Sequence, residues 1–136
     1  YSSSLRPEIG KECCVLVSAV NSDGNGLRGI IAPEIAVAVA AHTRWTLRHP
    51  DVGGDQQLLV FAGGTIPFYA TQSQRLGAGD PRPSIEERYS SKDDYLNQVE
   101  EAAEELVESR YLLSRDVEVS VELASRMWDW FTESDS

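Results

Sequence analysis

The sequence predicts a mixed α/β fold, of the α+β-like kind, and three observations support this prediction. Residues 21–26 form a dense cluster of turn formers between two short segments rich in β-branched residues, as in a β-hairpin. Over the last third of the chain, apolar residues recur at the i, i+3, i+4 spacing of amphipathic helices. The chain has 136 residues, of which 41% are hydrophobic, which is enough for one core but not for two domains.

The N-terminal part is expected to be an extended hairpin behind a polar lead. Residues 13–20 and 27–32 are predicted to be its two strands, joined by the turn at 21–26. Residues 1–12 and 132–136 are polar and are expected to be flexible ends of the single domain 1–136.

A buried apolar segment follows the hairpin. Pro33 suits the first position of a helix and Glu34 suits its first turn. Residues 35–41 are apolar on every side, which favours a buried helix. A buried strand is the alternative, because Val37 and Val39 alternate with alanine.

One further strand and a long loop complete the middle of the chain. Residues 57–62 are typical of a buried strand, which Gly63 and Gly64 are expected to end. Residues 65–91 contain repeated glycine and proline, which predicts a long irregular loop apart from a turn of helix near 70–76. Long loops in compact domains tend to be functional or to pack against another structure.

The last third is expected to form two C-terminal amphipathic helices. Ser91 and Asp94 resemble a capping box at the start of the first, and Ser114 can cap the second. Trp130 lies off the apolar stripe of the second helix, which suggests that another surface covers it. The predicted inner positions are Tyr95, Leu96, Val99, Ala102, Ala103, Leu106 and Val107, then Val117, Val121, Ala124, Trp128 and Phe131.

The chain is acidic, and the acid is unevenly placed. Its formal net charge is −10, and residues 69–136 carry 16 acidic against 7 basic side chains. Such a chain repels phosphate backbones, so we expect no nucleic-acid partner. No apolar run approaches the roughly 18 residues of a membrane span, so we expect no membrane-spanning segment. A solvated helix face explains most of the acid in the second half.

Cysteine and histidine usage predicts neither a cofactor nor a metal site. Cys13 and Cys14 are adjacent, a geometry that disfavours an unstrained disulfide, so they are expected to be reduced thiols. This slightly favours a reducing, cytoplasmic compartment. His42 and His49 add no metal-ligand spacing. The chain begins at Tyr1 without a secretory signal pattern, which suggests either a removed upstream segment or part of a longer protein.

The sequence assigns no catalytic residue. It contains no Gly-x-Ser-x-Gly motif, and neither glycine pair is followed by the Lys-Ser/Thr of a phosphate loop. The turn at 21–26 resembles half of a calcium loop, but the twelfth position is Ala32 instead of glutamate. His42 is a candidate only for a small independent hydrolase, with Glu34 or Asp80 as its carboxylate.

Residues 80–89 interleave acidic residues with arginines in the predicted loop. Such residues commonly form ion pairs that hold a loop on its domain, and a binding role is the alternative. The candidates for such a structural clamp or for an interface are Trp45, Arg48, Arg75, Asp80, Arg82, Glu87, Arg88 and Trp130.

Several motifs, taken in order, carry a family resemblance. They are Val-Asn-Ser-Asp-Gly-Asn at 20–25, Gly-Ile-Ile-Ala-Pro-Glu at 29–34, Ala-Val-Ala-Val-Ala-Ala-His-Thr-Arg-Trp-Thr-Leu-Arg at 36–48, Ala-Gly-Gly-Thr-Ile-Pro-Phe at 62–68 and Gly-Asp-Pro-Arg-Pro-Ser-Ile-Glu-Glu-Arg-Tyr at 79–89. Over about residues 7–131, the chain resembles the C-terminal region of a bacterial family of large, esterase-like proteins that contain an alpha/beta-hydrolase domain. The run at 79–89 is the most specific of these motifs.

The resemblance implies that the nucleophilic serine and the triad histidine lie upstream of this region. The chain would then be a non-catalytic portion or subunit that packs on a missing hydrolase core and shapes its entrance or an interface. The loop 65–91 would be the segment that docks there. His42 stands where the family has Thr or Tyr, so the resemblance gives it no catalytic role.

Two other functions stay open on the sequence. One is a free-standing interaction module or accessory subunit of a larger assembly, which would use Trp130 and the acidic helices and is compatible with an oligomer. The other is the small independent hydrolase that would use His42.

Overall fold

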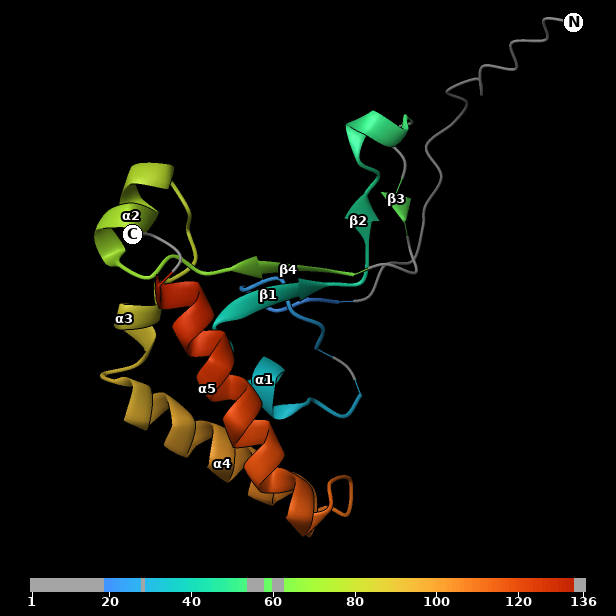
Figure 1. The fold of residues 1–136 in the computed structure, drawn as a ribbon, viewed down its shortest axis with the longest axis vertical. Coiled ribbons are helices and arrows are strands. Elements are labelled where there is room, and N and C mark those ends of the chain that lie inside the picture. The colour runs from blue at the N-terminus through green and yellow to red at the C-terminus, as the bar shows by residue number, and fades with distance from the viewer. Residues whose placement is uncertain (1–18, 28, 54–57, 60–62, 134–136) are drawn as a thin grey trace, which may run out of the picture.

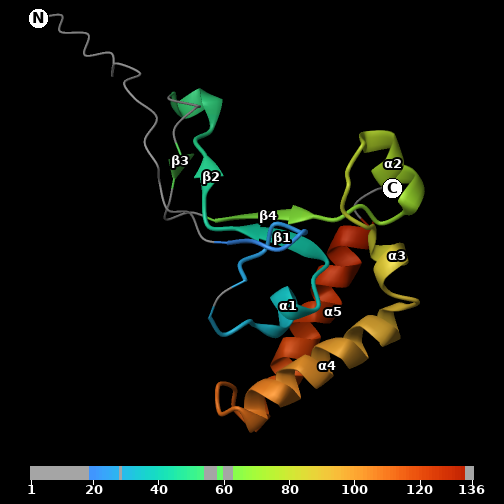
Figure 2. The ribbon, with the colours of Figure 1, turned by 180° about the vertical axis from the view of Figure 1, so that it is seen from behind.

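The computed structural model describes residues 19–27, 29–53, 58–59 and 63–133. Two long helices form most of the body, a two-stranded antiparallel ribbon crosses it, and a smaller two-stranded arm projects from one end of the ribbon (Figures 1 and 2). The predicted mixed α/β class is confirmed. The elements are α1 (Pro33–Ala36), β1 (Ala40–Thr43), β2 (Thr46–Leu47), η1 (Pro50–Val52), β3 (Leu58–Leu59), β4 (Gly64–Pro67), α2 (Gln72–Ala78), α3 (Ile85–Arg88), α4 (Lys92–Glu108), η2 (Ser114–Asp116) and α5 (Val117–Glu133).

Among the described residues, the predicted hairpin is present at its turn. Val20 and Gly26 form an isolated antiparallel bridge around it. The predicted second strand at 27–32 is wrong in its described part, where the chain is irregular. Gly29 has φ +97°, a left-handed conformation that interrupts an extended chain. Residues 13–18 of the predicted first strand lie outside the described residues.

The predicted apolar segment is buried at residues 38–41, but it changes structure along its length. The helix α1 is a single turn with Pro33 at its start, so the buried helix predicted over 35–41 ends at Ala36. The alternative, a buried strand, describes the end of the segment, which enters β1. Antiparallel pairing with β4 provides hydrogen-bond partners for backbone amide and carbonyl groups of β1.

The ribbon joins β1 to β4 with His42 opposite Thr65. Gly64 begins β4, so the long loop predicted over 65–91 is wrong at residues 65–67. A Cβ atom at Gly63 would lie 2.5 Å from the Thr43 carbonyl oxygen, so only glycine allows this close approach of the two chains. The strand predicted at 57–62 is present as β3, and its other residues lie outside the described ones.

The predicted long loop at 65–91 contains two short helices. Thr71 and Gln74 form a reciprocal capping box at the start of α2, which ends at Gly79 in the left-handed conformation. Ser84 and Glu87 form a second capping box at α3. The turn of helix predicted near 70–76 is thus present as α2, whereas the loop prediction is wrong over α3, which the Ser-x-x-Glu pattern of a capping box could have indicated.

The two predicted C-terminal helices are present as α4 and α5, and they pack against each other. Ser91 accepts a hydrogen bond from the Asp94 amide, whereas the Asp94 carboxylate accepts from Ser90, so the predicted capping box is only half formed. No helix among the described residues is long and apolar enough to cross a membrane. The buried residues of the two helices are Tyr95, Val99, Ala103, Ala124 and Phe131, all on the predicted inner positions.

An aromatic cluster forms the centre of this core. Tyr95 stacks on Trp128 with their ring centroids 5.2 Å apart, and Tyr89 packs on Tyr95 at 5.0 Å. The Tyr89 hydroxyl donates a 3.0 Å hydrogen bond to the Ala38 carbonyl oxygen. The cluster therefore joins both long helices to the segment before β1.

Candidate functional site

The α2–α3 segment carries a network of ion pairs centred on Glu87. Its carboxylate accepts hydrogen bonds from two nitrogens of Arg75, Nε at 2.7 Å and a terminal nitrogen at 2.8 Å. The amide and hydroxyl of Ser84 donate to it at 2.8 and 2.7 Å, and the Gln72 side chain donates at 2.9 Å. This carboxylate therefore joins the two short helices across the turn between them.

A second set of charged contacts surrounds the buried ring of Phe68. The guanidinium carbon of Arg88 lies 4.2 Å from the centre of the ring, and that of Arg82 lies at 5.3 Å. Arg88 also donates to Asp23 at 2.9 Å, which ties α3 to the N-terminal turn. Arg82 donates through Nε to Asp80 at 2.9 Å. Five of the predicted clamp residues thus lie in one region, namely Arg75, Asp80, Arg82, Glu87 and Arg88. We call the contacts of these five residues the α2–α3 clamp.

These contacts change the acidity of the carboxyl groups. Hydrogen bonds from the side chain and amide of Arg82 lower the pKa of Asp80 from 3.8 to about 2. The Arg75 guanidinium, followed by Ser84, lowers the pKa of Glu87 well below its usual range. Both carboxyl groups are therefore ionised in the folded chain at neutral pH.

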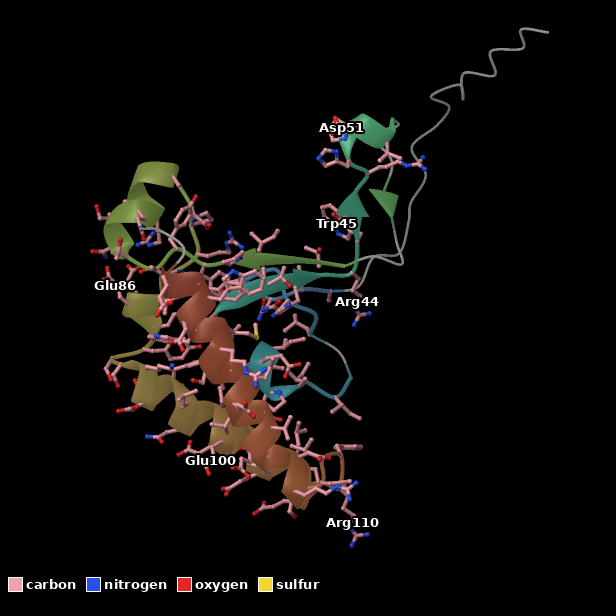
Figure 3. The ribbon with its side chains drawn as sticks, in the orientation of Figure 1. Arg44, Trp45, Asp51, Glu86, Glu100 and Arg110 are labelled. Atoms are coloured by element: carbon pink, nitrogen blue, oxygen red, sulfur yellow. The ribbon has the colours of Figure 1, made fainter. Side chains whose placement is uncertain are left out.

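Acid is expected to weaken the folded state through this clamp. Because the pKa of Asp80 is lowered to about 2 on folding, its contribution is present above pH 4 and is lost as the pH falls from about 4 to about 2. Chemical unfolding monitored by circular dichroism at several pH values measures this slope. Asp80→Asn should flatten it, whereas Glu100→Gln on the outer side of α4 (Figure 3) should leave it unchanged. An Asp80→Asn chain with the parent slope would contradict this role.

His42 lies in β1, opposite Thr65 in β4. Its Nδ1 lies 3.3 Å from the Thr65 hydroxyl, while its Nε2 is buried without a hydrogen-bond partner among the described residues. Glu34 lines the same cavity as His42. The other carboxylate considered, Asp80, is bound to Arg82. No carboxylate in the described part of the chain forms a hydrogen bond or ion pair with His42.

A largely apolar groove of about 700 Å³ lies between the ribbon and the C-terminal half of α5. One wall comes from β4 and the residues after it, and the other comes from α5. Among the described residues, the hydroxyl groups that line the groove are those of Thr65 and Tyr69. No serine or cysteine of the described residues lines it. The residues that line it are Glu34, His42, Thr65, Pro67, Phe68, Tyr69, Leu123, Met127, Trp130 and Phe131.

The remaining candidate residues lie apart from the clamp. Trp45 is exposed at the base of the projecting arm (Figure 3), and Arg48 is half-buried just beyond β2. Trp130, near the end of α5, is 69% exposed and lines the groove. A second cavity, of about 410 Å³, is lined by Val20, Gly24, Gly26, His42, Thr43, Arg44 and Trp45.

Sequence reasoning missed the structural role of Asn25. This side chain is fully buried, donates to the Ala40 carbonyl oxygen at 3.1 Å and accepts from the His42 amide at 2.6 Å. It therefore binds the backbone of β1 on both sides of residue 41. Asparagine at 25 was one member of a cluster of turn formers, and no local signal distinguished it from its neighbours.

The described residues contain no group of three or more His, Cys, Asp or Glu side chains that could hold a metal ion. Comparison with known protein families gives a match. A family model described as an alpha/beta hydrolase domain matches residues 8–122, which is well over half of the chain. No curated protein and no solved structure shows a significant match. The groove wall formed by Leu123, Met127 and Trp130 lies beyond the matched residues.

Proposed function

This chain belongs to the alpha/beta hydrolase domain family, and we propose that it is a non-catalytic C-terminal portion or subunit of such a protein. In this role it packs on the catalytic core and shapes the entrance or an interface. The core supplies the nucleophilic serine and the triad histidine.

The observation that carries this proposal is the open apolar groove between β4 and α5. Concave, largely apolar clefts of several hundred Å³ are typical of binding sites. The α2–α3 clamp supports the proposal because it holds the segment at one end of the groove in a fixed position. The residues that line the groove also support a non-catalytic role, because no serine or cysteine of the described residues lies beside His42 there.

A small independent hydrolase is the second candidate, and the unpartnered Nε2 of His42 favours it. A buried imidazole nitrogen beside a cavity is a candidate general base. In that role it would need a hydroxyl nucleophile, and Thr65 is bound to the other ring nitrogen. The Thr65 hydroxyl lies at Nδ1 and not at Nε2, the nitrogen that would act as the base. We therefore prefer the first proposal.

Hydrolysis of a p-nitrophenyl ester by the purified chain separates the two. We expect a rate equal to the buffer background, and an equal rate for His42→Ala and for the control His49→Ala. Hydrolysis that is lost in His42→Ala or in one serine-to-alanine variant, and kept in His49→Ala, would overturn the first proposal and support the second.

A further inference from the structure

One face of α5 is apolar although it points away from the core. Val119, Leu123 and Trp130 are 61%, 49% and 69% exposed. Met127 lies between the last two at the edge of this face, where it is half-buried and also packs against the core. The spacing of i, i+4, i+8 and i+11 places these side chains in one row of about 16 Å along the helix. We call Val119, Leu123, Met127 and Trp130 the α5 outer face.

The α5 outer face is continuous with the groove. Leu123, Met127 and Trp130 line both, and Pro67 and Tyr69 form the facing wall. The combined surface is therefore an elongated apolar strip with a recess at one end. An amphipathic helix binds by laying its apolar face along an elongated apolar surface, whereas a small ligand needs a compact pocket, so the shape of this strip favours a helix.

Charged groups, mostly acidic, border one side of this strip. The helix carries Glu118, Glu122, Asp129 and Glu133 against a single cation, Arg126. Glu122 forms an ion pair with Arg126, and Asp129 is bound by Lys92 at 2.7 Å. A second copy of this chain would bring the same excess of acid and a net charge of −10 to the interface. A partner with basic flanks is complementary to it instead.

We propose that the α5 outer face and the groove bind an amphipathic helix with an apolar stripe and basic flanks. Resting on the proposed function, this helix belongs to the catalytic core of the hydrolase. Its apolar side chains pack between Leu123 and Trp130 and enter the groove beside Tyr69. Its lysine or arginine side chains lie near Glu118 and Glu133, at the two ends of α5.

The probe for this site is a synthetic peptide of 18 residues with leucine on one helical face and lysine on the other. A second peptide carries glutamate in place of lysine. Calorimetric titration of the whole chain should show binding of the lysine peptide and at least tenfold weaker binding of the glutamate peptide. Sedimentation should show that the chain alone is a monomer.

Matched variants locate the site. The double variant Val119→Ser with Leu123→Ser should weaken binding of the lysine peptide at least tenfold. Leu76→Ser, which changes an exposed leucine on α2, should leave it unchanged. Glu118→Gln with Glu133→Gln should weaken binding about threefold and reduce its salt dependence. Glu100→Gln with Glu104→Gln, on α4, should do neither.

Several results would overturn the inference. They are equal binding of both peptides, binding of neither, equal loss in Leu76→Ser, and a dimer that Leu123→Ser dissociates. Peptide binding does not depend on the hydrolase assignment. If the lysine peptide binds as expected but the chain alone hydrolyses the ester through His42, the basic helix remains the occupant and its origin in a hydrolase core is refuted.

Discussion

Tyr95→Ala is expected to lower the free energy of unfolding by about 3–5 kcal/mol, as for other large aromatic residues removed from a core. The Tyr95 side chain is fully buried and stacks on Trp128 and Tyr89. Truncation leaves a cavity where α4, α5 and the segment before β1 meet. Because small domains have only about 5–15 kcal/mol of stability, the variant should unfold at much lower urea concentration or be unfolded without it. Circular dichroism during urea titration measures the difference.

The two tyrosine hydroxyl groups of this cluster provide the control. The Tyr95 hydroxyl is buried without a hydrogen-bond partner among the described residues, whereas the Tyr89 hydroxyl donates to the Ala38 carbonyl oxygen. Tyr95→Phe should therefore keep or raise stability, and Tyr89→Phe should lower it by about 1 kcal/mol. If Tyr95→Phe were the more damaging of the two, the packing described for this cluster would be incorrect.

Asn25→Ala is expected to lower the free energy of unfolding by about 2–4 kcal/mol, because it leaves two backbone groups of β1 without partners. These groups are the Ala40 carbonyl and the His42 amide, which Asn25 now binds at 3.1 and 2.6 Å. Asn25→Asp should also destabilise, since a carboxylate cannot donate to the Ala40 carbonyl. Urea unfolding of each variant, followed by circular dichroism, is the measurement.

Asn97→Ala is the matched control for this prediction. Asn97 is exposed on α4, where alanine is the better helix former, so its replacement should leave stability equal or slightly higher. A loss of less than about 0.5 kcal/mol in Asn25→Ala, within the usual range of surface changes, would show that the two hydrogen bonds are dispensable.

The sequence predicts α4 and α5 well because their apolar spacing repeats over several turns. The predicted cap at Ser114 is wrong, since Ser114 begins η2 and α5 begins at Val117. Tyr95, Val99 and Ala103 are three predicted inner positions that the structure buries. Around residues 27–32 the prediction failed because β-branched composition is compatible with an irregular chain once Gly29 adopts a left-handed conformation. Strand pairing depends on a distant partner, and only the fold shows that β1 pairs with β4.

The candidate site also has one part that the sequence could indicate and one part that it could not. The ion pair of Arg82 with Asp80 joins residues two apart, so the run of alternating charges could indicate it, whereas Arg75 reaches Glu87 from outside that run. The groove could not be predicted, because its walls come from β4 and from α5, far apart in the chain. Trp130 was the one residue whose position off the inner stripe indicated an outward apolar surface.

The contact between Arg88 and Asp23 also has a consequence for the order of folding. It closes a loop of 65 residues, whereas α4 and α5 are joined by a short turn, and long loops lose more chain entropy on closure. The helical pair should therefore form first, and the N-terminal turn should join it last and open most readily. Hydrogen exchange should show this as faster exchange of the Asn25 amide than of the Val99 amide. We therefore expect the C-terminal third of the chain to remain ordered when the N-terminal turn opens.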